Sequence, residues 1–216
     1  SKAAADTVAP RGGARMSAVP KKKLTVDEYL AIERAAEFKS EFYDGVMYPL
    51  QGPGGPQGMA GAKFDHNLVK ENLSVELANR LRGGPGRTPS SHMRVRIDAT
   101  GLHTYPDLVV FCGAPEFADE KRDTLMNPVV IVEVLSPSTE KYDRGAKFRQ
   151  YQRIPTLQEI VLVAQDEPLV ERFVRQADES WALTAVTSLE GVFAFHSIPV
   201  TLPLTAIYDG VTFPTE

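Results

Sequence analysis

Two apolar stretches decide the fold: Asp107-Leu-Val-Val-Phe111 and Val129-Val-Ile-Val-Glu-Val-Leu135. Each is a nearly continuous hydrophobic run of strand length, which is typical of a strand covered on both faces of a sheet. Each also carries one acid, Asp107 in the first and Glu133 in the second. A carboxylate in a covered strand costs free energy unless it is paired or binds a cation. A turn cap at Asp107 and an arginine partner for Glu133 are structural alternatives, but two such acids on neighbouring strands favour one shared site.

The sequence before these strands predicts a helix and then a hairpin. The helix begins at Thr25, because Thr25-x-x-Glu28 has the spacing of a capping box. Glu41–Leu50 is a predicted hairpin that turns at Asp44-Gly45, a pair that tolerates positive φ. The glycine- and proline-rich stretch Gly52–Gly61 is a predicted loop.

A second helix is predicted from about His66 to Arg82, with Asp65 as its N-cap and Gly83-Gly84-Pro85 at its end. An apolar residue every fourth position gives this helix one face that packs on the core. That stripe consists of Val69, Leu73, Leu77 and Leu81. The alternation in Met93–Ile97 then predicts a half-exposed strand.

After the Glu133 strand, a third helix is predicted from about Asp143 to Arg153, ending before Pro155. Ile160–Ala164 reads as another buried strand, and the hydrophobic pattern of 169–174 and 181–187 predicts a hairpin. The central order is therefore α–β–β–β–α–β. It predicts an α/β fold of restriction endonuclease-like type, a mixed sheet flanked by helices. An N-terminal helix plus hairpin precedes this sheet and a C-terminal β extension follows it. Residues 1–23 are a predicted disordered leader, and 24–210 a predicted single domain.

Composition excludes several classes of site. The chain has 216 residues, a net charge of −4 and one cysteine, Cys112, so an intramolecular disulfide and a thiolate zinc cluster are excluded. No two of its four histidines form an HxH or HExxH pair. No apolar run approaches the roughly 18 residues of a membrane span, and the N-terminus lacks the apolar segment of a signal peptide. We therefore expect a cytoplasmic protein without a membrane partner.

Basic residues gather in two acid-free stretches, 77–97 and 144–153. Such stretches could neutralise the phosphates of a nucleic acid, or they could be solvated faces that balance acids elsewhere. The residues that we single out as candidate contacts to a nucleic-acid backbone are Arg94, Arg96, Arg149 and Arg153.

The two acids have the chemistry of a magnesium site. Mg²⁺ takes oxygen ligands, commonly one or two carboxylates together with water and phosphate oxygens. Asp107, Glu133 and the backbone carbonyl of Val134 could supply the protein ligands for Mg²⁺ or Mn²⁺. Lys147 lies in the helix that follows the Glu133 strand, on the same face as Gln150 and Tyr151. It could supply the positive charge that a phosphate transition state requires, although an ordinary surface lysine is the structural alternative.

Several motifs together resemble the Uma2 (DUF820) family of the PD-(D/E)XK nuclease-like superfamily. They are Tyr105-Pro106-Asp107, Glu133-Val-Leu-Ser-Pro-Ser-Thr139, and the downstream Asp143, Lys147 and Tyr151. The strict superfamily pattern has lysine two residues after the acid, where this chain has Leu135. The resemblance implies that Lys147 takes that role. It also implies a further carboxylate near the metal at Glu41, and a ligand or phosphate contact at His66.

Three functional hypotheses follow. The leading one is a Mg²⁺-dependent endonuclease that hydrolyses phosphodiester bonds in nucleic acid, with DNA as the expected substrate; a homodimer is compatible with it. The second is a non-catalytic binding or interaction protein that retains the nuclease fold. The third is a glycosidase, which would use the two carboxylates but gives no role to Lys147.

Overall fold

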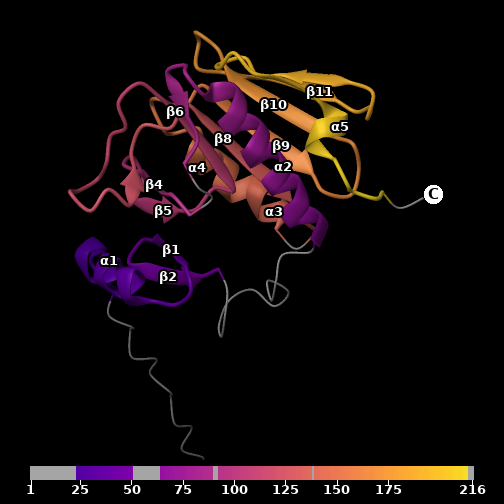
Figure 1. Cartoon of the computed structure of the whole chain (residues 1–216). Helices are drawn as coiled ribbons and strands as arrows, with labels where there is room; N and C mark the ends of the chain where they lie inside the picture. Colours follow the sequence, from indigo (N-terminus) through magenta and orange to yellow (C-terminus); the bar gives the residue numbers. More distant parts are fainter. Residues whose placement is uncertain (1–22, 51–63, 90–91, 138, 214–216) are drawn as a thin grey trace, which may run out of the picture.

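The computed structural model describes residues 23–50, 64–89, 92–137 and 139–213 (Figure 1). The expected leader, except for Lys23, and the loop predicted over 52–61 lie outside this range. The main element of the fold is a six-stranded sheet. The strands are β3 (Gly86–Arg87), β6 (Leu108–Cys112), β8 (Val130–Leu135), β9 (Glu159–Ala164), β10 (Val170–Arg175) and β11 (Trp181–Val186). Their order is β11-β10-β9-β8-β6-β3, and only β8 and β9 run parallel to each other. The mixed sheet predicted from the sequence is confirmed.

The connection between β8 and β9 is helical, because two parallel neighbours require a crossover. It consists of α3 (Glu140–Tyr142), a π-helical turn η1 (Asp143–Lys147) and α4 (Phe148–Tyr151). The single helix predicted from Asp143 to Arg153 therefore begins three residues earlier and ends two residues earlier. The 3.6-residue periodicity carries no sign of the widened π turn. In that turn Asp143 and Lys147 are both buried.

Helix α2 (Phe64–Leu81) lies across one face of the six-stranded sheet (Figure 1). Its predicted stripe of Val69, Leu73, Leu77 and Leu81 is buried against β6, β8 and β9. The same core contains α5 (Leu204–Ile207) and residues of β12 (Val192–Ala194) and β13 (Thr201–Pro203). The prediction of Asp65 as N-cap is wrong, since the helix begins at Phe64. Asp65 instead lies in the first turn, where the helix dipole favours an acid.

A second sheet has five strands in the order β2-β1-β5-β4-β7. They are β1 (Ser40–Tyr43), β2 (Val46–Pro49), β4 (Arg94–Ile97), β5 (Leu102–Thr104) and β7 (Thr124–Leu125). The predicted hairpin is β1–β2, and its turn residues Asp44 and Gly45 have φ values of 47° and 78°. The strand predicted over 93–97 is β4. It belongs to this second sheet and not to the sheet that carries Asp107 and Glu133.

Helix α1 (Val26–Ala35) covers one face of the hairpin. Its predicted capping box is present: the Glu28 N–H donates to Thr25 Oγ1 over 3.1 Å, and the Thr25 N–H donates to Glu28 Oε2 over 2.8 Å. Tyr29 of this helix stacks on Phe42 of β1 with a centroid distance of 4.6 Å. Because side chains alternate along a strand, Glu41, next to Phe42, lies on the opposite face of the hairpin and points away from α1.

The two sheets share one apolar core. Val95 and Leu102 of the five-stranded sheet pack in the same cluster as Val109 and Ile131 of the six-stranded sheet. Glu41 and Thr104 lie on the core-facing side of the first sheet, as Asp107 and Glu133 do on the second, because side chains alternate along each strand. The polar residues therefore gather where the apolar core between the sheets ends.

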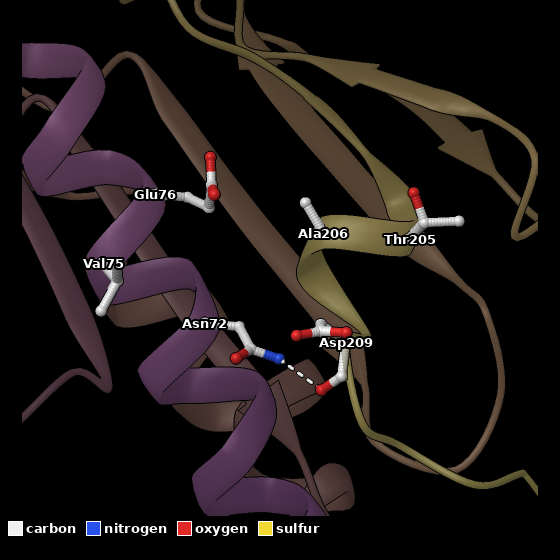
Figure 2. Close-up of a pocket in the computed structure, with 6 residues that line it drawn as sticks. All are labelled: Asn72, Val75, Glu76, Thr205, Ala206 and Asp209. Carbon is white, nitrogen blue, oxygen red and sulfur yellow. Dashed lines mark hydrogen bonds between the residues drawn. The ribbon is translucent and has the colours of Figure 1, made fainter.

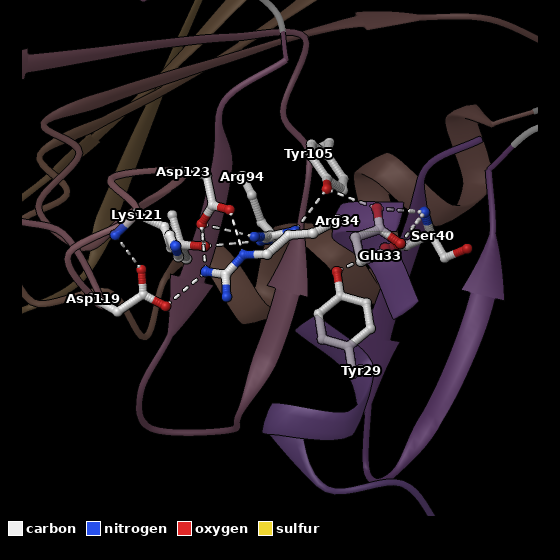
Figure 3. Close-up of polar contacts among 10 residues, drawn as sticks. Tyr29, Glu33, Arg34, Ser40, Arg94, Tyr105, Asp119, Lys121 and Asp123 are labelled. Atoms are coloured by element: carbon white, nitrogen blue, oxygen red, sulfur yellow. Dashed lines mark hydrogen bonds and ion pairs between the residues drawn. The ribbon is translucent and has the colours of Figure 1, made fainter. Parts of the chain in front are cut away.

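A network of charged side chains attaches the N-terminal unit, which consists of α1, β1 and β2, to the rest of the fold (Figure 3). Arg34 of α1 donates to Asp123 and Asp119 over 2.7 and 2.6 Å. Asp123 also pairs with Arg94 at 2.9 Å. Together these contacts join α1 to the segment that contains β7. No helix in the described part of the chain is long and apolar enough to span a bilayer.

Candidate active site

Asp107 and Glu133 lie opposite each other at the junction of β6 and β8. The register of these strands pairs Leu108 with Val132, and its continuation by one residue pairs Asp107 with Glu133 on one face. The Asp107 N–H donates to Glu133 Oε2 over 3.3 Å. In return, Asp107 Oδ2 accepts the Val134 N–H over 2.9 Å. The two acids that the sequence placed on neighbouring strands are thus brought together, and neither structural alternative describes them.

Lys147 reaches the same cluster from the π turn. Its ammonium Nζ lies 2.9 Å from Glu133 Oε1 and 3.6 Å from Asp143 Oδ1. Tyr151, one helical turn later, donates its hydroxyl to Glu133 Oε1 over 2.5 Å. Lys147 is only 6% exposed, so it is not the surface lysine that the sequence left as an alternative. Gln150 lies in the next turn, and its buried Oε1 has no hydrogen-bond partner within the described residues.

The hairpin contributes a third carboxylate, Glu41. Its side chain accepts hydrogen bonds from Thr104 Oγ1 and, over 2.8 Å, from the Tyr142 hydroxyl. Its Oε1 lies 4.0 Å from Lys147 Nζ. Lys147 is therefore surrounded by Glu41, Glu133 and Asp143, each supplied by a different segment of the chain.

Helix α2 faces Asp107 from the other side. His66 Nε2 lies 3.4 Å from Asp107 Oδ1, and Lys70 Nζ lies 3.9 Å from the same oxygen. The two residues are four positions apart, so they occupy one face of the helix. His66 was among the candidates from the sequence, whereas Lys70 was not. The spacing of Lys70 from His66 was the available signal for it.

Burial and charge crowding shift the protonation of this cluster. Burial raises the pKa of Glu133 to about 8 and is helped by Asp143 and Asp107, although Lys147 opposes it. Burial also raises the pKa of Asp143. Burial alone would lower the pKa of Lys147, but Glu133 and the other neighbours hold it well above its usual value. The ammonium therefore keeps its proton, and the crowding of the buried carboxylates favours proton uptake at Glu133 and Asp143.

Asp107 behaves differently from the other buried acids. Burial would raise its pKa, but His66, Lys147 and the Val134 N–H together lower it. Asp107 is thus held ionised, whereas burial favours the neutral forms of Glu133 and Asp143. This difference within one cluster is typical of functional sites, where neighbouring groups have separate tasks.

The carboxylates fit a cation that takes few ligands from the protein. Among the described residues, no three His, Cys, Asp or Glu side chains form a ready metal-binding group. Asp107 Oδ1 has only the long contacts to His66 and Lys70, and Glu133 Oε2 accepts one 3.3 Å hydrogen bond in the described part. These two oxygens retain lone pairs, and a cation between them would relieve the crowding of the carboxylates. That donor set suits Mg²⁺ or Mn²⁺, which keep several waters. The ligand role of the Val134 carbonyl stays a prediction.

The four arginines singled out from the sequence do not share one environment. Arg94 is only 3% exposed, and it bonds to Thr124 and Tyr105 besides its ion pair with Asp123. The exposed position predicted for it is therefore wrong, because these partners bury the guanidinium. Arg96, also in β4, pairs with Asp98 in the turn that follows the strand. Arg149 and Arg153 are exposed near the end of the helical crossover, and their contact with a nucleic acid stays a prediction.

A separate hollow of about 430 Å³ lies between α2 and α5 (Figure 2). Its lining residues are Asn72, Val75, Glu76, Thr205, Ala206 and Asp209. Asn72 donates its amide to the backbone carbonyl of Asp209, and Glu76 pairs with Arg80. This hollow contains none of the residues of the acid cluster. We place the candidate active site at the cluster because that is where the perturbed acids and the buried lysine meet.

Comparison with known proteins gives a consistent result. The profile of a family named Uma2, described as "Putative restriction endonuclease", matches residues 26–205. The uncharacterized protein slr1290 of Synechocystis sp. is 31% identical and covers 93% of this chain and 99% of its own length. A second uncharacterized protein of that organism, sll1609, is 36% identical and covers 82% and 96%. The crystal structure of a "putative nuclease belonging to DUF820" from Anabaena variabilis shares the fold. Its TM-score is 0.65 at 19% identity, and the match covers 88% of this chain and 99% of that one.

Proposed function

The chain belongs to the Uma2 family, and from this premise we propose that it is a metal-dependent endonuclease that hydrolyses phosphodiester bonds in nucleic acid, with DNA as its substrate. The observation that carries the proposal is the convergence of Asp107, Glu133 and Lys147. These three side chains come from two adjacent strands and the following crossover, and Lys147 Nζ lies 2.9 Å from Glu133. Stability of the fold does not require a lysine buried among acids, because an apolar side chain would fill that position without the cost of burying a charge.

Each residue of the cluster has a distinct task in this proposal. Asp107 and Glu133 would hold Mg²⁺ or Mn²⁺. A bound divalent cation supplies positive charge to the phosphate and acidifies a water molecule. Lys147 keeps its proton and places a second positive charge beside the phosphate while water attacks phosphorus in line. Tyr151 fixes the orientation of Glu133, and His66 does the same for Asp107.

The test is cleavage of supercoiled plasmid and of labelled oligonucleotides with Mg²⁺, with Mn²⁺, and with a chelator. We expect cleavage with metal only. Asp107→Asn removes a charge but little volume, so it should lower the rate by on the order of 100-fold or more while the protein stays folded. Asp98→Asn is the matched control, since Asp98 is exposed and pairs with Arg96. Equal cleavage by wild type and Asp107→Asn would refute the assignment. Gel filtration of the same preparations tests the homodimer.

A second candidate is a binding protein that retains the fold without catalysis. The observation that favours it is the internal pairing of the cluster: Glu133 Oε1 already accepts from Tyr151 and contacts Lys147. An ion must compete with those contacts. Calorimetric titration with Mn²⁺ separates the two candidates. The endonuclease must bind Mn²⁺, and Asp107→Asn must weaken that binding, whereas the binding protein needs no metal ion.

A further inference from the structure

The β1–β2 hairpin packs one face on α1, and its other face carries Glu41 toward the acid cluster. Phe42 and its cross-strand partner Met47 form the packed face. Because side chains alternate along a strand, this second face carries the buried Glu41 and its exposed cross-strand partner Tyr48. Tyr43, paired with Val46, is next on the same face. The row that supplies a carboxylate to the cluster therefore continues into aromatic residues.

These aromatic side chains are exposed to solvent. Tyr43 and Tyr48 are 39% and 49% exposed. Tyr142, which is 40% exposed, extends the surface because it donates to Glu41 and its ring centroid lies 6.0 Å from Lys147 Nζ. We call Tyr43, Tyr48 and Tyr142 the tyrosine face. Apolar residues scattered singly over a surface need no explanation, but a group of rings beside buried reactive groups indicates a binding surface.

Positive charges lie at the other end of the same surface. Lys39 immediately precedes β1, and its Nζ lies 4.9 Å from the centroid of the Tyr105 ring. Lys70 Nζ lies 3.9 Å from Asp107 Oδ1. Burial and the charge of Lys70 lower the pKa of Lys39, and these lysines in turn lower the pKa of His92, Lys39 being the main cause. Two ammonium groups at one end of the surface, one over Tyr105 and one beside Asp107, favour the approach of an anion there.

We propose that this surface binds single-stranded nucleic acid, with unpaired bases stacked on the tyrosine face and backbone phosphates beside Lys39 and Lys70. The proposal rests on the proposed function, because it names the class of substrate for that site. Aromatic rings bind bases of any sequence through their flat faces, which base pairing and stacking within a duplex keep covered. A single strand also suits the depth of the cluster, since the Asp107 side chain is 20% exposed and Glu133 is 3% exposed.

The chain's net charge of −4 supports this choice of partner. Binding of a duplex depends on many phosphate contacts, and its strength rises with the number of cations that face the backbone. Here two lysines accompany three exposed tyrosines, so stacking must provide much of the affinity. That balance between stacking and charge is the one found in proteins that bind single strands.

The test is fluorescence anisotropy of the full chain with a labelled thymidine oligonucleotide of about 12 nucleotides and with a duplex of the same length. Chelator is present throughout, so that no cleavage interferes. We expect tighter binding to the single strand. Tyr48→Ala should weaken it by on the order of tenfold, while Tyr48→Phe should bind as wild type because the ring is retained. Leu183→Ala is the control, since Leu183 is 53% exposed on β11. Unchanged affinity of Tyr48→Ala, or tighter binding of the duplex, would overturn the proposal.

Salt dependence tests the phosphate half of the surface. Lys70→Gln should make the plot of log affinity against log salt shallower by about 0.7, which is the value for one contact to a single strand. Arg80→Gln, later in the same helix and paired with Glu76, should leave the slope unchanged. An unchanged slope for Lys70→Gln would refute the placing of the phosphates. Single-strand binding of the expected kind without cleavage under any metal would support this surface and refute the endonuclease. Cleavage of duplex without single-strand binding would support the endonuclease and refute this binding surface.

Discussion

At the scale of single residues, the partners of a side chain decide whether it is buried, even for a charged residue that sequence patterns place on the surface. Arg94 and Arg96 alternate with apolar residues in sequence, and both were expected on an exposed face. Arg94 is buried because Thr124 and Tyr105 bond to it and Asp123 pairs with it. Its hydrogen bond with Thr124 joins residues 30 positions apart, so no local pattern could reveal it. A buried arginine with several polar partners stabilises a junction and is not available to a nucleic acid.

His103 provides a prediction at this scale. It is 1% exposed between Tyr29 and Phe42, and burial lowers its pKa to about 4, with Arg94 and Arg96 acting in the same direction. Because the folded-state pKa lies below the unfolded value of about 6.5, the unfolded chain takes up a proton first as the pH falls. The stability linked to His103 is fully present above pH 6.5 and is lost as the pH falls toward 4. The total loss is about 3 kcal/mol.

Urea unfolding between pH 7.5 and 4.5 measures this loss. His103→Gln cannot titrate, so its free energy of unfolding should fall less steeply than that of wild type over this range. His196→Gln serves as the control because His196 is exposed. Identical slopes for wild type and His103→Gln would show that other groups cause the acid sensitivity.

At the scale of elements, the strands were more predictable than the crossover. The two continuous apolar runs predicted the strands that carry Asp107 and Glu133, and the observed register of β6 and β8, continued by one residue, places both acids on one face. The helical crossover was misplaced at both ends, and its π turn was missed. In that turn Asp143 and Lys147 are buried next to each other, and Lys147 also contacts Glu133 and Glu41 from distant segments. The sequence around the turn contains no record of those partners.

Gly145 in the π turn gives a prediction for this element. A methyl group added at its Cα would meet nothing within 4 Å, and its φ is not positive. Gly145→Ala should therefore raise the free energy of unfolding by about 0.5–1 kcal/mol, since alanine loses less chain entropy in a helix. Gly45→Ala is the contrasting variant, because Gly45 has a φ of 78° and its added carbon would lie 2.6 Å from Lys23 Cβ. It should destabilise. Urea unfolding compares the two, and destabilisation by Gly145→Ala would mean that the π turn needs glycine.

At the scale of the whole molecule, the acid cluster depends on the attachment of the N-terminal unit. Glu41 belongs to that unit, whereas Asp107, Glu133 and Lys147 belong to the six-stranded sheet and its crossover. Arg34, Asp119 and Asp123 fasten the unit across the surface (Figure 3). None of these three residues was singled out from the sequence, since surface charges of either sign occur throughout the chain.

Arg34→Ala tests this attachment. The variant loses both ion pairs to the segment 119–123, so the free energy of unfolding should fall by about 1 kcal/mol at low salt and by less at 1 M salt. Hydrogen exchange should speed up in β1 and stay unchanged in β8, because only the N-terminal unit is loosened. Arg80→Ala, which removes one ion pair within α2, is the control. Equal acceleration in β1 and β8 would indicate global destabilisation and refute a local fastening.

The distances along the chain between the contacts of Glu41 have a consequence for folding. Its hydrogen bonds reach Thr104, 63 residues away, and Tyr142, 101 residues away. Such contacts close late, because long loops must be ordered before the contacts repay the entropy. A ribosome-bound chain that has not yet emerged as far as Lys147 has the hairpin and the Asp107 strand without the lysine. The acid cluster is therefore complete only when its crossover has been synthesised, and a shorter growing chain does not carry it among the nucleic acids of the ribosome.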